Sequence, residues 1–147
     1  MSHSLNKIWI HSIWATKNRY PYITSKIESE VHGKMLSEFN KMDCSVKIIN
    51  GMPDHVHCLY LLNPNRSIAD VLKQVKGGSA FAINELGLIP DKFGWQTGYA
   101  SYSVSESALQ RVYDYIKNQK QHHTQKTFED EYNELIQLMN NSPSISI

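Results

Sequence analysis

Two histidines separated by one residue, His55 and His57, are the side chains whose type and spacing point most directly to chemistry. They lie in the stretch His-Val-His-Cys-Leu-Tyr-Leu-Leu, residues 55–62, which is predicted to be a strand. Side chains at positions i and i+2 of a strand point to the same face, so the two imidazoles stand side by side, about 7 Å apart at the backbone. This arrangement suits two ligands of one metal ion. The alternative is a pair of surface histidines on an open sheet face.

A tyrosine and a glutamine four residues apart, Tyr115 and Gln119, form the second candidate pair. An apolar stripe predicts a helix around them: Leu109, Val112 and Ile116. Residues at positions i and i+4 share one face of a helix and lie about 6 Å apart. Tyr115 and Gln119 fall at one edge of the apolar stripe, so they are expected to face a neighbouring element. Tyr113 falls on the opposite flank. The alternatives are an ordinary half-buried aromatic residue for Tyr115 and a solvated amide for Gln119.

Together, two imidazoles and one amide oxygen make an incomplete shell for an octahedral divalent ion. Open positions remain for water and for a phosphate oxygen, which favours Mg²⁺ or Mn²⁺ over a closed zinc site. Such an ion polarises a phosphodiester and neutralises charge in the transition state. A tyrosine beside it can attack phosphorus, and the covalent phosphotyrosine conserves the energy of the broken bond. The combination therefore predicts metal-dependent cleavage and rejoining of a phosphodiester without ATP.

The elements that must position these residues follow from hydrophobic periodicity and turn residues. Strands are predicted at residues 6–16, 44–50, 55–62 and 99–104. Helices are predicted at residues 25–42, from Ser67 onward, from Ser103 or Ser105 to about His122, and at residues 128–139. This order is typical of an α+β ferredoxin-like sandwich, with an antiparallel sheet of four or five strands and extra C-terminal helices. In that topology the first and third strands are central neighbours. Helices on one face leave the other face free for a site or a partner.

Local signals indicate where some of these helices begin and end. Ser25 and Glu28 have the spacing of a capping box, which predicts the start of the first helix. Ser67 is expected to cap the second helix. The pair Gly77-Gly78 is expected to end or kink that helix.

The composition is that of an ordinary globular protein. At 147 residues the chain is expected to form one domain, residues 1–147, with a core that needs no disulfide scaffold. Cys44 and Cys58 are interpreted as reduced thiols of a cytosolic protein. The longest apolar runs, of about five residues, are too short to span a bilayer. The N-terminus has no apolar signal core, so the prediction is a cytoplasmic protein with no membrane anchor.

The net charge is only +1, but the charges are unevenly distributed along the chain. All 15 lysines and arginines lie at or before Lys126, and four of the 14 acidic residues follow it. A basic body with an acidic tail can meet phosphate through local patches. The alternative is a solvated surface of mixed charge.

Four stretches, in order, resemble the single-tyrosine HUH transposases of bacterial insertion sequences, the IS200-like family. Residues 52–59, Met-Pro-Asp-His-Val-His-Cys-Leu, resemble the His-hydrophobic-His motif of that family. Residues 115–119, Tyr-Ile-Lys-Asn-Gln, followed by His122-His123, resemble its nucleophile helix. Residues 13–19 and 95–105 are also similar to the family, and the similarity extends over roughly residues 7–135.

The resemblance implies a ferredoxin-like homodimer that excises and inserts single-stranded DNA and recognises hairpins near the ends of its element. By motif position, the metal ligands are His55, His57 and Gln119, and the ion is Mg²⁺ or Mn²⁺. Tyr115 becomes the nucleophile, whose attack leaves a 5′-phosphotyrosine and a free 3′-OH. In many family members the tyrosine helix serves the metal site of the partner subunit. The glycines at 77, 78 and 98 would then be suitable hinge points.

A near-neutral protein of this kind would hold DNA through local patches. The candidate phosphate contacts are Lys17, Arg19, Lys73, Lys76, Lys117 and Lys120. The candidate aromatic platforms for unpaired bases are Trp95, Tyr99 and Tyr102. The alternatives are solvated charges for the cations and core packing for the aromatic rings.

Three rival functions are compatible with parts of this pattern. One is a catalytically silent module of the same family that grips DNA hairpins. A second is a related HUH nuclease that starts plasmid replication or transfer, although such nucleases are usually larger. A third is an unrelated metal hydrolase with water as its nucleophile, for which Tyr115→Phe would leave activity nearly intact.

Overall fold

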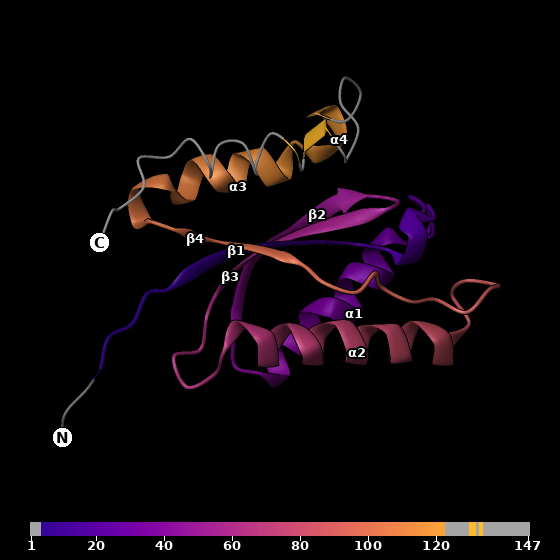
Figure 1. The fold of residues 1–147 in the computed structure, drawn as a ribbon, viewed down its shortest axis with the longest axis horizontal. Helices are drawn as coiled ribbons and strands as arrows, with labels where there is room; N and C mark the ends of the chain where they lie inside the picture. The colour runs from indigo at the N-terminus through magenta and orange to yellow at the C-terminus, as the bar shows by residue number, and fades with distance from the viewer. Residues whose placement is uncertain (1–3, 123–129, 132, 134–147) are drawn as a thin grey trace.

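A four-stranded antiparallel sheet with the strand order β2-β3-β1-β4 forms the centre of the fold (Figure 1). The computed structural model describes residues 4–122, 130, 131 and 133. The strands are β1 (Trp9–Ala15), β2 (Ser45–Met52), β3 (His55–Leu61) and β4 (Ala100–Val104). The helices are α1 (Glu28–Lys41), α2 (Ile68–Leu86), α3 (Leu109–Lys117) and α4 (Gln119–His122). Two 3₁₀ helices are η1 (Lys17–Arg19) and η2 (Glu106–Ala108). This order, with β1 and β3 as central neighbours, confirms the predicted ferredoxin-like class.

The pairing of β1 with β3 determines which side chains share a face of the sheet. Ala15 lies opposite His55, and Ile13 lies opposite His57. Because side chains alternate along a strand and directly paired residues share a face, His11, Ile13 and His57 lie on one face. The predicted placement of both motif histidines on a single face of a strand is therefore correct.

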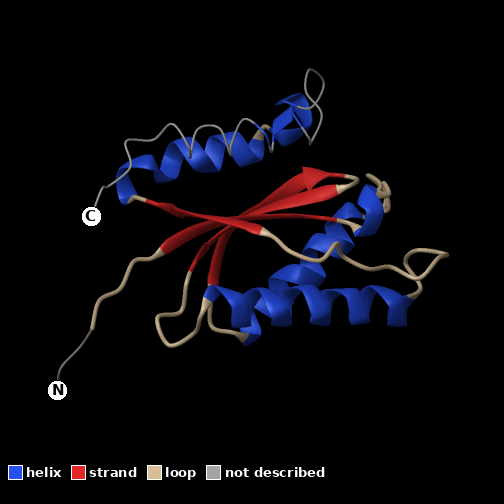
Figure 2. Cartoon of the chain, in the orientation of Figure 1, coloured by secondary structure: helices blue, strands red, loops and turns tan. Residues whose placement is uncertain are grey.

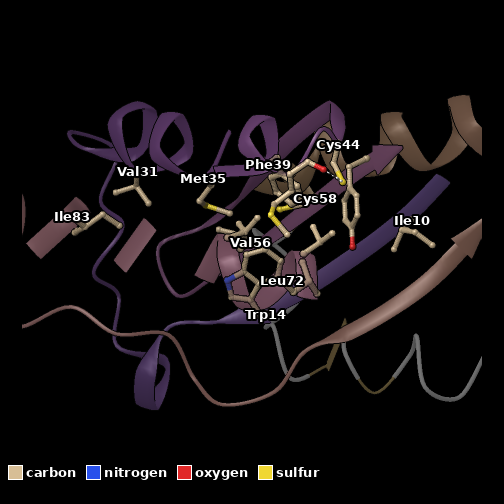
Figure 3. Packing of buried hydrophobic residues seen from close by; sticks show 14 of the residues in the cluster. Ile10, Trp14, Val31, Met35, Phe39, Cys44, Val56, Cys58, Leu72 and Ile83 are labelled. Carbon is tan, nitrogen blue, oxygen red and sulfur yellow. Dashed lines mark hydrogen bonds between the residues drawn. The ribbon is translucent and has the colours of Figure 1, made fainter. Parts of the chain in front are cut away.

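The main apolar core lies between the opposite face of the sheet and the helices α1 and α2 (Figure 3). The strands contribute Ile10, Trp14, Val56, Cys58 and Tyr60. The helices contribute Val31, Met35, Phe39, Val71, Leu72, Val75 and Ile83. Burial of this many large apolar side chains is the dominant favourable contribution to folding. It holds β1 and β3 in a rigid frame beneath the histidines.

The prediction of helices on one face implied that the second face of the sheet would be open. In the structure this face is covered. Figure 2 shows α3 on the side of the sheet opposite to α1 and α2. Ile116 packs there in a small cluster with Leu59 and Val104. The side-chain amide of Asn50 on β2 donates hydrogen bonds to the carbonyl oxygens of Ile116, at 2.9 Å, and Lys117, at 3.1 Å. These contacts place α3 across the strands that carry the histidines.

Two of the predicted helix boundaries are wrong. The residue that precedes α1 is Ile27, which makes no side-chain cap, so Ser25 does not form the expected capping box. Helix α2 continues through Gly77-Gly78 to Leu86, and ends where Gly87 adopts a left-handed φ of 61°. Gly78 lies close to α1, and a Cβ at this position would force the side chain of Glu38 to shift. The predicted cap is confirmed for Ser67, whose hydroxyl accepts a hydrogen bond from the backbone N–H of Asp70 at 3.0 Å.

The C-terminal part of the chain is more segmented than predicted. The expected helix from residue 103 or 105 to about residue 122 is divided into η2, α3 and α4, with Asn118 between the last two. Of the helix predicted at 128–139, residues 130, 131 and 133 are helical and the others lie outside the described residues. In the part of the chain that the structure describes, no helix combines the length and hydropathy needed to cross a membrane.

Candidate active site

The motif histidines of β3 are both completely buried, and their ring centroids lie 5.3 Å apart. Nδ1 of His55 donates to the carboxylate of Asp54 at 2.8 Å. Nε2 of the same ring lies 3.4 Å from the amide oxygen of Gln119. The alternative of a surface histidine pair therefore does not apply, because both rings are buried. A buried imidazole must have polar partners, and His55 has them.

His57 is held by different partners, and its ring lies at 70° to that of His55. Its Nδ1 lies 2.9 Å from Nε2 of His11 on β1. Its Nε2 lies 2.9 Å from Oε1 of Glu131. In both motif histidines, Nδ1 is thus held by a neighbouring group, and Nε2 faces an oxygen atom, of Gln119 for His55 and of Glu131 for His57.

Burial lowers the pKa of His11 from 6.5 to about 3. The charge of His57 acts in the same direction, and the carboxylate of Glu131 opposes it. His11 is therefore a neutral imidazole at ordinary pH, with one nitrogen as donor and the other as acceptor.

Tyr115 reaches the histidines from α3. Its ring centroid lies 5.8 Å from that of His57 and 6.4 Å from that of His11, both edge-on. Its hydroxyl donates a hydrogen bond to Oε1 of Glu131. The predicted edge position is confirmed, and the contacts are with the histidines of its own chain. Tyr113 lies apart, with the ammonium of Lys47 5.7 Å from its ring centroid.

Gln119 reaches the same place from α4, and it is completely buried. Its Nε2 donates to Oε1 of Glu131 at 3.2 Å, and its Oε1 faces His55. Although Asn118 interrupts the helix, Tyr115 and Gln119 converge as the i, i+4 spacing predicts. One carboxylate oxygen thus receives contacts from Tyr115, Gln119 and His57.

The donor set fits a divalent cation. His55, His57 and Glu131 each offer a ligand atom, and these atoms lie within 4.8 Å of one another. The amide oxygen of Gln119 is a fourth donor close to His55. Two nitrogens and two oxygens, with Nδ1 of each ring held by a second group, are suited to a divalent ion of the first transition row or to Mg²⁺.

The six candidate phosphate contacts differ in what surrounds them. Lys76 donates to the carbonyl oxygens of Gln96, at 2.9 Å, and Gly98, at 2.8 Å, so it supports the loop before β4. Lys120 donates to Glu28 and to the side-chain oxygen of Asn50, both at 2.8 Å. The other four are exposed at the surface: Lys17, Arg19, Lys73 and Lys117.

The candidate aromatic platforms also differ. Trp95 packs edge-on against Trp14, with ring centroids 5.9 Å apart, and donates to Ser79 at 3.0 Å, so core packing accounts for it. Tyr102 is partly buried, 6.0 Å from the ring of His11. Tyr99 is 43% exposed. Only Tyr99 of these three is presented to solvent as a stacking platform would be.

Two residues of the site, His11 and Glu131, were not predicted from the sequence. His11 carried a usable signal, because an imidazole inside an apolar strand needs a partner. Glu131 carried none, since it is one of four acids in an apparently solvated tail. Its place in the site is a matter of tertiary contacts, with Tyr115, Gln119 and His57.

These features define a class: a ferredoxin-like α+β protein whose sheet carries a buried imidazole pair facing a tyrosine, a glutamine and a glutamate. Residues 4–119 match the family model described as "Transposase IS200 like". The chain belongs to this family of transposases, which confirms the resemblance seen in its motifs.

Individual relatives agree with this assignment. The chain is 27% identical to the ISDra2 transposase TnpA of Deinococcus radiodurans over 114 residues, which cover 74% of this chain and 81% of that protein. A crystal structure of a protein from Deinococcus radiodurans R1, described as a transposase, is 26% identical with a TM-score of 0.65, covering 81% of this chain and 95% of that one. A REP-associated tyrosine transposase bound to a REP hairpin shares the fold, with a TM-score of 0.60 and 15% identity over 84% of this chain and 74% of that one.

Proposed function

We propose that this transposase cuts and rejoins single-stranded DNA with Tyr115 as its nucleophile. The observation that carries the proposal is the convergence of Tyr115, His57 and Gln119 on one oxygen atom, Oε1 of Glu131. A nucleophile and two ligands that meet at one point in a buried site can act together on one phosphate group.

In this reaction the phenolic oxygen of Tyr115 forms a bond to phosphorus, and the bond from phosphorus to the 3′ oxygen breaks. The products are a 5′-phosphotyrosine and a 3′-OH, which takes up one proton as the tyrosine loses one. Rejoining reverses these steps with a second 3′-OH, so no nucleotide cofactor is consumed.

His55, His57 and Gln119 would hold the metal ion, Mg²⁺ or Mn²⁺, and Glu131 is a further candidate ligand. The bound ion supplies Lewis-acid polarisation of the phosphate. The protein supplies orientation: Asp54 holds the ring of His55, and the packing of Ile116 fixes α3 so that Tyr115 faces the histidines.

The proposed DNA partner is single-stranded and carries hairpins at the ends of a mobile element, and the active protein is a homodimer. Support comes from the family and from the related transposase that binds a REP hairpin. Exposed Lys17 and Arg19 lie in η1, directly after β1, at the same end of the sheet as His55. Cations at this edge suit a phosphate backbone that enters the site.

The test is a covalent-adduct assay with labelled single-stranded DNA from the regions that flank the gene. With Mn²⁺ or Mg²⁺, the wild-type protein and Tyr113→Phe should form a labelled band at the mass of protein plus DNA on a denaturing gel. Tyr115→Phe and His57→Ala should form none. Cleavage that survives Tyr115→Phe would favour a water nucleophile, whereas hairpin binding without any adduct would favour a silent binding module.

A further inference from the structure

We propose that His11 is a positioning residue for the metal ligand His57: it accepts a hydrogen bond from Nδ1–H and thereby keeps the lone pair of Nε2 turned toward the metal site. The proposal rests on the proposed function in one respect, that His57 binds the ion.

The first support is the distance between the rings and their burial. Nε2 of His11 lies 2.9 Å from Nδ1 of His57, and the rings stack with centroids 5.1 Å apart at an angle of 26°. His11 is 5% exposed and His57 is not exposed at all. Water therefore has little access to this hydrogen bond.

The second support is the chemistry of a metal-bound imidazole. A neutral ring carries its single proton on one nitrogen, so binding an ion through Nε2 requires the proton on Nδ1. That N–H is buried here and needs an acceptor, because an unpaired buried donor costs free energy. Nε2 of His11 has the position and, in the neutral ring, the lone pair for this role.

The third support comes from the second motif histidine. Nδ1 of His55 is held by Asp54 at 2.8 Å, so in each of the two candidate histidine ligands a second residue contacts Nδ1. Groups of this kind fix the tautomer and the orientation of a metal ligand. The two differ in origin: Asp54 is adjacent to His55 in sequence, whereas His11 reaches His57 only through the pairing of β1 with β3.

Two substitutions separate the acceptor from the volume of the ring. His11→Phe keeps the ring and removes the acceptor, whereas His11→Gln puts an amide oxygen near the position of Nε2. Mn²⁺ affinity, measured as free ion by electron paramagnetic resonance, should fall about 10- to 100-fold in His11→Phe and stay within about threefold in His11→Gln. His32→Gln, at a histidine outside the site, should bind Mn²⁺ as the wild type does.

A second measurement needs no substitution. Long-range ¹H–¹⁵N spectra of the wild-type protein with saturating Mg²⁺ should show His57 with its proton on Nδ1. A proton on Nε2 would overturn the proposal, and so would an unchanged Mn²⁺ affinity in His11→Phe. If His57→Ala binds Mn²⁺ as the wild type does, the proposed metal site fails. If only His57→Ala loses binding, the metal site stands and the role of His11 fails.

Discussion

The hydroxyl of Tyr115 donates a hydrogen bond to Oε1 of Glu131, and the same carboxylate oxygen lies 2.9 Å from Nε2 of His57. The candidate nucleophile and a candidate metal ligand are therefore joined through one acidic side chain. Glu131 is 1% exposed, and it belongs to the part of the chain beyond the family match at residues 4–119. A residue outside the shared motifs thus completes the centre of the site.

Replacing Glu131 should weaken binding of the divalent ion. Glu131→Gln keeps the size of the side chain but removes the charge that favours a cation, and we expect the Mn²⁺ dissociation constant to rise roughly tenfold. Free Mn²⁺ can be counted by electron paramagnetic resonance. Asp130→Asn is the matched control. Asp130 precedes Glu131 in the sequence and is exposed, and this variant also loses one negative charge. An affinity that is equal in the two variants would show that Glu131 is not a ligand.

Active sites should form within single chains. Tyr115 contacts the histidines of its own chain, and α3 follows β4 after only Ser105 and η2. Mixing Tyr115→Phe with His57→Ala should therefore restore no adduct, because each site would lack one essential group. Restored adduct, up to about a quarter of the wild-type level when the two proteins pair at random, would instead mean that the tyrosine helix acts in the partner.

Two adjacent glycines in α2 should respond in opposite directions to alanine. Gly77 has open space around its Cβ position, so Gly77→Ala should stabilise the helix by about 0.5–1 kcal/mol. A Cβ on Gly78 would meet the buried side chain of Glu38, so Gly78→Ala should destabilise the protein by about 1–3 kcal/mol. Urea unfolding followed by circular dichroism gives both values. Equal effects would mean that Glu38 moves aside without cost.

Acid should destabilise the protein partly through His32. Burial lowers its pKa to about 4, with Glu28 opposing this shift and Lys120 adding to it. The unfolded ring titrates near 6.5, so the unfolded state binds the proton first, and stability falls as the pH drops from about 6.5 to 4.

His32→Gln removes this titration, so its stability should fall less than that of the wild type over the same interval. We expect a difference on the order of 2 kcal/mol, since the ring is partly exposed. Urea midpoints at several pH values measure it. His11, whose pKa is also lowered by burial, stays in both proteins and does not affect the comparison. Parallel curves for the two proteins would rule out the contribution of His32.

The sequence alone determined the features that depend on local periodicity. Alternation along a strand places His55 and His57 on one face, the apolar stripe orients Tyr115, and the hydroxyl of Ser67 caps α2. Each follows from the geometry of a single element, which is the same wherever that element packs. The strand order followed from the succession of elements, because few topologies can connect them.

Only the tertiary structure decided which distant residues complete the site. His11 reaches His57 through the register of β1 with β3, and Glu131, far from it in the sequence, lies beside it through a tertiary contact. Helix α2 continues through Gly78, where the side chain of Glu38 lies close to its backbone, and Ile116 packs α3 onto the second face of the sheet. These contacts are decided by packing between elements, where burial and hydrogen bonding outweigh local preferences that favour a break at glycine or an open face.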